Sequence, residues 1–197
     1  MNSAVKLFII ILIPFLAGLS MPETKPLNES FFGEDMNPDR IDGPFTGGFG
    51  EQTCHSCHFD YDLNMDGGSL SAEGFPVAFR AGEEYDITVS VESEHLRNGG
   101  FQLTTRFEDG SQAGSFSWNG DHLKYTPGIS DDIKYLQHTR ESTIPTGERK
   151  VSWNFTWQAP ECSGEEVIIN IAANAGNDDD SAFGDWIYVK ELILKPQ

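Results

Sequence analysis

The sequence lacks several patterns that would each have indicated a familiar class of protein. No second pair of closely spaced cysteines accompanies the pair at positions 54 and 57, so a four-ligand zinc site is not expected. There is no nucleophile elbow, no phosphate-binding loop and no convincing amphipathic helix pattern. Basic residues are scarce, 13 against 31 acidic ones, and the net charge of −18 repels nucleic acid and anionic membranes. The 197 residues suffice for one domain with processing segments, and the 12% of aromatic residues favours a β-rich fold.

The N-terminus has the features of an export signal. Residues 1–6 carry one positive charge, residues 7–19 form a short apolar run, and the small residues Gly18 and Ser20 suit cleavage after position 20. The run is short for a membrane span, although an uncleaved signal would hold the protein at the membrane. No cysteine ends the run, so a lipoprotein is not expected. We predict a signal peptide at residues 1–20 and a periplasmic or secreted protein.

The most informative stretch is Cys54-His-Ser-Cys-His58, which has the attachment pattern of c-type haem. Two thiols three positions apart can add to the two vinyl groups on one edge of a porphyrin. The next side chain, His58, then lies under the ring and can bind iron as the proximal ligand. His55, between the cysteines, is expected to point away. The pattern therefore predicts covalent haem c bound through Cys54, Cys57 and His58.

Three other interpretations of the motif are a disulfide between Cys54 and Cys57, a redox-active Cys-x-x-Cys pair, and half of a zinc site. A redox pair is typical of a βαβ context, which does not follow here. Zinc would need more ligands than this chain offers nearby. Cys162, the third cysteine, lies in a turn-like stretch, and we assign it no chemistry.

Two segments without regular structure are predicted between the signal and the main domain. Residues 21–50 hold four prolines and five glycines and form a loop-rich lead-in. Its last part, residues 44–50, either wraps the haem edge with aromatic and backbone contacts or is a plain linker. Residues 51–75 form the haem-attachment segment.

From residue 77 onward, apolar and polar side chains alternate with a period of two. Such alternation indicates half-buried antiparallel strands, and Gly-rich and Asp/Asn-rich turns separate them. The segment at 167–173 is apolar throughout, which predicts burial on both faces. We predict a β-sandwich of about seven strands at residues 76–197. The clearest strands are 85–92, 101–107, 151–157, 167–173 and 186–194.

Seven motifs lie between residues 44 and 188: Cys54-His-Ser-Cys-His58, Gly68-Ser-Leu70, Ala81-Gly-Glu-Glu-Tyr85, Gly99-Gly-Phe-Gln-Leu103, Tyr135-Leu-Gln-His-Thr139, Trp157-Gln-Ala-Pro160 and Gly184-Asp-Trp-Ile-Tyr188. Taken as a set, they resemble the bacterial choice-of-anchor V domain, a relative of the reelin N-terminal (reeler) domain. The resemblance implies an exported, immunoglobulin-like antiparallel β-sandwich. Eukaryotic reeler domains do not carry the Cys-x-x-Cys-His run, so their binding roles do not transfer.

The second axial ligand of the iron is the main question that the sequence leaves open. His138 is our first candidate because it lies in a segment that matches the resembled family. Arg140, two residues on, would project to the same face of an extended segment and meet a haem propionate. Met65, His95 and His122 are the alternatives, as is an iron with an open or water-bound position.

A calcium site is a further candidate. Asp62, Asn64, Asp66 and Glu73 fit the spacing of a calcium-binding loop, with Gly67 at the sharp turn. No helix is expected on either side of this loop, and an acidic turn in an acidic protein is the alternative.

These observations favour an exported monohaem c-type cytochrome that carries electrons rather than an enzyme. Its redox partner is expected to present a basic patch, because opposite charges attract across an interface. An adhesion or ligand-binding module with structural haem or a disulfide, and a haem enzyme with an open iron site, are the alternatives.

Overall fold

The computed structural model describes residues 43–126, 132–145, 147, 149–161 and 164–197. The expected signal peptide, most of the lead-in and Cys162 lie outside the described residues. The five clearest predicted strands are confirmed. They are β3 (Glu84–Ser93), β4 (Asn98–Arg106), β8 (Lys150–Gln158), β9 (Val167–Gly176) and β10 (Trp186–Pro196).

Five shorter strands complete the sheets, so the described residues form ten strands rather than about seven. Four of the five have only two or three residues, too few for an alternating pattern to be visible in the sequence. The longer one, β1, lies within the range predicted for haem attachment and pairs with β3 along its whole length. The five are β1 (Gly68–Glu73), β2 (Ala78–Phe79), β5 (Ser115–Ser117), β6 (Leu123–Tyr125) and β7 (Leu136–His138).

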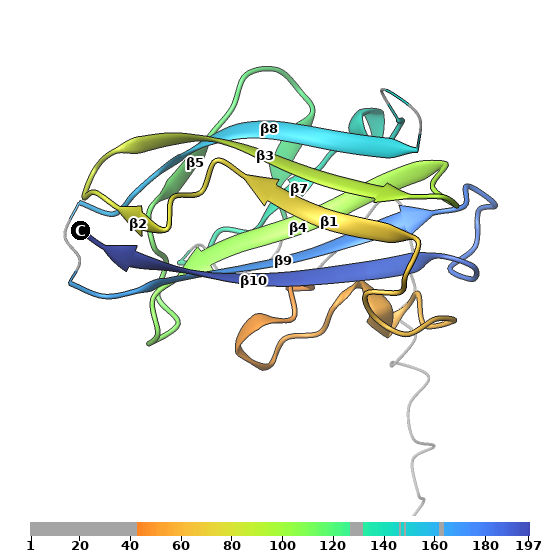
Figure 1. Ribbon diagram of the computed structural model, residues 1–197, viewed down its shortest axis with the longest axis horizontal. Coiled ribbons are helices and arrows are strands. Elements are labelled where there is room, and N and C mark those ends of the chain that lie inside the picture. Colours follow the sequence, from red (N-terminus) through yellow and green to blue (C-terminus); the bar gives the residue numbers. More distant parts are fainter. Residues whose placement is uncertain (1–42, 127–131, 146, 148, 162–163) are drawn as a thin grey trace, which may run out of the picture. The chain divides into compact units, whose positions relative to one another are not determined.

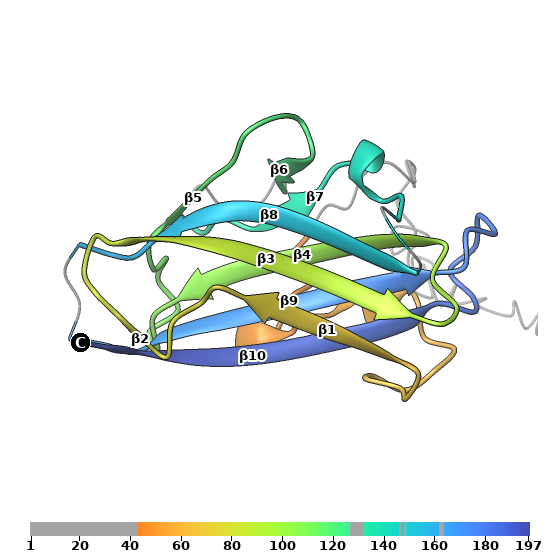
Figure 2. The same ribbon diagram turned by 45° about the horizontal axis from the view of Figure 1, so that its top comes forward.

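The strands form two sheets that pack face to face, as Figures 1 and 2 show. One sheet has four strands in the order β1-β3-β8-β5, and the other has six in the order β2-β10-β9-β4-β7-β6. Every pairing is antiparallel except the short contact between β2 and β10, which is parallel. The predicted all-β sandwich is therefore confirmed.

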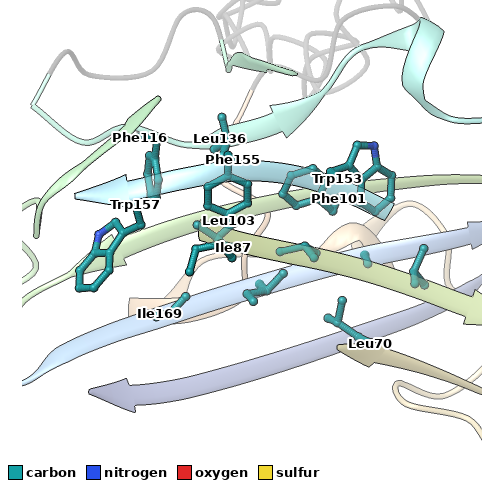
Figure 3. Packing of buried hydrophobic residues seen from close by; sticks show 14 of the residues in the cluster. Leu70, Ile87, Phe101, Leu103, Phe116, Leu136, Trp153, Phe155, Trp157 and Ile169 are labelled. Carbon is teal, nitrogen blue, oxygen red and sulfur yellow. The ribbon is translucent and has the colours of Figure 1, made fainter. Parts of the chain in front are cut away.

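The hydrophobic core lies between the two sheets. In β3 and β8, the apolar members of each alternating pair point inward and their polar neighbours point outward, as the period of two requires. Figure 3 shows Phe101 of β4 beside Trp153 of β8, with ring centroids 4.6 Å apart. Trp157 is fully buried, and Phe75, Phe79 and Tyr85 surround it. β9 is buried on both faces, as predicted.

The second face of β9 is buried because residues 43–67 cover the outer side of the six-stranded sheet. In Figures 1 and 2 this orange segment lies against β9 and β10, away from β3 and β8. It has little regular structure of its own, only the 3-10 turns η2 (Gly48–Gly50) and η3 (Cys54–Ser56). The other 3-10 turn among the described residues is η4 (Arg140–Ser142), and none of their helices is long and apolar enough to cross a membrane.

Candidate functional site

A cavity of about 290 Å³ lies between the covering segment, as we call residues 43–67, and the six-stranded sheet. Its walls are predominantly apolar, as is usual for small-molecule sites, and its volume is near the lower end of their range. One wall comes from the Cys-x-x-Cys-His motif, with Phe45 and Thr53 beside it. The rest of the lining comes from the first half of β4, the end of β7, Thr143 and Asn174. The motif therefore borders a predominantly apolar cavity that is partly open to solvent.

The turn η3 gathers the three motif side chains on one side. The Thr53 hydroxyl accepts a hydrogen bond from the His55 amide at 3.1 Å and so caps the turn. The amides of Cys57 and His58 both donate to the carbonyl of Cys54, at 3.2 and 3.0 Å. Residues three and four apart in such a turn lie on the same face. Cys54, Cys57 and His58 consequently line the same cavity.

The two thiols are not joined in a disulfide. Burial raises the pKa of the Cys54 thiol to about 12, so it is protonated at neutral pH. A redox-active cysteine reacts as its thiolate, which a lowered pKa favours. Among the described residues, no group of three or more His, Cys, Asp or Glu side chains is arranged to hold a bare metal ion. The redox and zinc interpretations of the motif therefore have no support in this geometry.

His58 is oriented by a buried carboxylate. Its Nδ1 lies 2.7 Å from Oδ2 of Asp185, whose side chain is only 5% exposed. No described residue hydrogen-bonds to Nε2, the other ring nitrogen. Sequence reasoning did not assign a role to Asp185, although it stands within the Gly184–Tyr188 motif used for the resemblance, directly before β10. An acidic residue at the start of a buried strand was the available signal.

His138 lines the same cavity, at the end of β7. Its Nδ1 is 3.0 Å from the amide nitrogen of Phe101 and 3.1 Å from the Phe101 carbonyl oxygen. Burial lowers the pKa of His138, the hydrogen bond with the Phe101 backbone offsets part of this effect, and Lys124 lowers the pKa a little further, so the imidazole is neutral at pH 7. A methyl group at Gly100 would lie 2.5 Å from Cε1 of His138, so only glycine leaves room for the ring.

The other candidate axial ligands do not line this cavity. His95 packs on Trp186 with ring centroids 4.4 Å apart. The Nε2 of His122 lies 3.0 Å from the carbonyl of Asn154, and Met65 packs against the hydrophobic core. His55 also points elsewhere, with Nε2 2.8 Å from the Tyr61 carbonyl.

Arg140 does not continue an extended segment, contrary to the expectation that placed it on the face of His138. β7 ends at His138 and the turn η4 begins at Arg140, which rotates the side chains out of strand alternation. Arg140 is exposed and does not line the cavity, whereas Thr143, just after the turn, does. Of the two phenylalanines in residues 44–50, Phe45 lines the cavity, whereas Phe49 packs on Arg106, so contact of this stretch with a haem edge stays a prediction.

The predicted calcium loop is not assembled as such a loop requires. The side-chain oxygen of Asn64 accepts a hydrogen bond from the Val189 amide at 2.8 Å, which ties the segment to β10. Glu73 ends the strand β1 and pairs with Thr88, so an extended strand separates it from Asp62 and Asp66. The acidic side chains among the described residues form no metal-binding group. Calcium binding stays a prediction that this geometry does not favour.

A buried ion pair that the sequence did not lead us to predict holds the covering segment against the sheet. Nη1 of Arg106, in β4, lies 2.6 Å from Oε1 of Glu51, and both side chains are at most 10% exposed. Glu51 also accepts hydrogen bonds from Thr46, at 2.6 Å, and Tyr135, at 2.5 Å. The Phe49 ring covers the guanidinium of Arg106, 4.1 Å from the ring centroid. These contacts fix the segment that carries the motif.

No model of a protein family matches the chain, and no curated protein matches it either. Solved structures show similar folds. The Reelin-N domain of F-spondin is 20% identical over 69% of this chain and 90% of that domain, with a TM-score of 0.48. The human F-spondin reeler domain (fragment 1) is 19% identical over 68% and 93%, with a TM-score of 0.45. A cohesin module from a Clostridium perfringens family 33 glycoside hydrolase is 11% identical over 66% and 96%, with a TM-score of 0.43. These similarities concern the fold alone.

Proposed function

We propose that the chain is an exported monohaem c-type cytochrome that transfers single electrons. Cys54 and Cys57 would hold the haem covalently, His58 would be the proximal ligand, and His138 the distal ligand. When bound, the haem supplies a one-electron Fe(III)/Fe(II) couple whose potential depends on axial ligands and burial. The observation that carries the proposal is that the motif and His138 line one apolar cavity, while Met65, His95 and His122 do not.

The residues present fit such a group. Nδ1 of His58 is engaged by Asp185, which leaves Nε2 as the nitrogen available to iron. His138 is neutral because of its burial, and a neutral imidazole is the form that binds metal. The absence of a side chain at Gly100 provides space for the His138 ring at the edge of β4. The chain's own residues thus supply two thiols, two imidazoles and an apolar wall.

The test is protein made with a cytochrome c maturation system. We expect the intact mass to include one haem that survives denaturation, and the visible spectrum to be that of low-spin iron. The His138→Ala variant should keep the covalent haem, shift toward high spin and bind carbon monoxide or cyanide. His122→Ala is the matched control and should retain the wild-type spectrum. An unmodified mass for the wild type would rule out the haem proposal. The chain would then be better explained as an adhesion or ligand-binding module.

A second function is favoured by the contacts of His138. If its Nδ1 accepts the Phe101 amide proton, then Nε2 carries a proton and cannot bind iron. The site would then have an open iron position with His138 as a distal hydrogen-bond donor, as in a small-gas-binding or peroxidase-like protein. High-spin iron in the wild type that binds carbon monoxide without mutation would favour this function over the electron carrier.

A further inference from the structure

We infer that Asp185 is a positioning residue for His58, whose carboxylate fixes the orientation and tautomer of the imidazole and strengthens Nε2 as a ligand. The inference rests on the proposed function, because it concerns how His58 would bind haem iron. The contact that carries it is the 2.7 Å distance between Oδ2 of Asp185 and Nδ1 of His58. It joins the last residue of the motif to the residue directly before β10, more than a hundred residues later in the chain.

Asp185 is itself held in place. Its Oδ2 accepts a hydrogen bond from the side-chain amide of Asn174, in β9, at 3.1 Å. Its Oδ1 accepts one from the backbone amide of Asn177 at 3.0 Å. Both oxygens of this buried carboxylate therefore have donors from the β9–β10 hairpin, and the third donor is the imidazole. A carboxylate held by the sheet in this way gives His58 a rigid partner rather than a mobile surface charge.

The same contacts identify which nitrogen of His58 carries the proton. A carboxylate accepts hydrogen bonds but does not donate them, so the 2.7 Å contact places the proton on Nδ1. Asn174 also approaches Nδ1, at 3.4 Å, but its amide group already donates to Asp185 over a shorter distance. Nε2 is thus the lone-pair nitrogen, and it belongs to a side chain that lines the cavity.

A carboxylate behind a metal-bound histidine raises the basicity of the ligand. A more basic ligand stabilises Fe(III) relative to Fe(II), because the oxidised iron carries more positive charge. Asp185 should therefore lower the midpoint potential of the protein. A polar residue that only filled space at this position would have no such effect.

The test compares two neutralising variants in the haem-loaded protein. Asp185→Asn keeps the shape but weakens the hydrogen bond to His58. Asp180→Asn removes the same charge from an exposed position in the same hairpin, where the left-handed backbone (φ 60°) tolerates asparagine. We expect Asp185→Asn to change the Fe(II)/Fe(III) ratio at a fixed applied potential at least tenfold in favour of Fe(II), which corresponds to 59 mV for one electron. Asp180→Asn should change it much less.

A spectroscopic measurement isolates the bond to His58. In the His138→Ala background, the iron–His58 stretching frequency of the ferrous protein should fall when Asp185→Asn is added. Equal potential shifts in the two Asp variants, or an unchanged stretching frequency, would overturn the inference while covalent haem and the proposed function stand. A wild type without haem would instead overturn the proposed function.

Should Asp185→Asn fail to fold, a protein that keeps Asp185 provides the answer alone. The Nδ1 proton of His58 should give a resolved resonance in the cyanide-bound His138→Ala protein, and it should exchange slowly with solvent. Rapid exchange would mean that the proton is not held by a buried carboxylate, and the inference would be wrong.

Discussion

The lack of a side chain at Gly100 decides whether the ring of His138 fits in its place beside β4. An added methyl group would lie 2.5 Å from Cε1 and 2.8 Å from Nε2 of His138, closer than van der Waals contact allows. The ring would have to leave the edge of β4 and give up its contact with the Phe101 backbone. Losing one such hydrogen bond costs about 1 kcal/mol.

We therefore predict that Gly100→Ala reproduces the effect of His138→Ala without touching a ligand. The haem-loaded variant should shift toward high spin, as seen in its visible spectrum, with only a small loss of stability. Gly147→Ala is the control, because a methyl group there meets nothing within 4 Å. A wild-type spectrum for Gly100→Ala would show that the ring position of His138 does not matter to the iron.

The covering segment, residues 43–67, depends on the buried pair of Glu51 and Arg106 because it has little regular structure of its own. Breaking a buried ion pair from one side leaves an uncompensated charge and costs about 3–5 kcal/mol. Glu51→Gln should therefore lower the free energy of unfolding by about 3 kcal/mol, measured by urea denaturation. Glu83→Gln, which breaks the exposed pair with Arg80, should cost less than about 1 kcal/mol. Equal losses of unfolding free energy in the two variants would mean that the Glu51–Arg106 pair does not stabilise the covering segment.

The long strands and the motif could both be predicted because their patterns are local in the sequence. Long strands such as β3 and β8 bury every second residue, and this alternation is visible in one dimension. The Cys-x-x-Cys-His spacing is local in the same way, so Cys54, Cys57 and His58 were found together. Short strands carry no such pattern, and β1 was overlooked because pairing with β3 rather than its own periodicity defines it.

The partners of the motif could not be found by the same reasoning because they come from distant parts of the chain. Asp185 meets His58, and Arg106 meets Glu51, only when β9, β10 and β4 lie side by side. Arg140 was misplaced because a three-residue turn interrupts the alternation on which the expectation relied. Sequence periodicity thus identified the sheets, whereas the contacts that orient the site depend on sheet order.

At the scale of the whole molecule, the net charge of −18 should govern encounters with redox reagents. Reduction of the haem-loaded protein by hexaammineruthenium(II), a cation, should slow as salt rises, because salt screens the attraction. Oxidation of the reduced protein by ferricyanide, an anion, should accelerate as salt rises, because the same screening weakens the repulsion. Stopped-flow rates at ionic strengths from about 0.01 to 0.1 M, where the Debye length falls from about 30 to 10 Å, test both directions. Rates that do not respond to salt would show that the acidic surface has no influence at the site of electron exchange.

The burial of Cys54 has a consequence for the order of events during biosynthesis. In the folded chain this thiol is protonated, with a pKa of about 12, and it belongs to the covering segment, which the Glu51–Arg106 pair holds against the sheet. A thiol in that state is a poor nucleophile towards a vinyl group. Attachment should therefore precede docking of the covering segment. Purified, folded apoprotein with free thiols should fail to acquire covalent haem from the maturation system, whereas chain that is still unfolded acquires it. Intact-mass measurements on the two preparations test this order, and equal yields would show that the folded cavity remains open to the reaction.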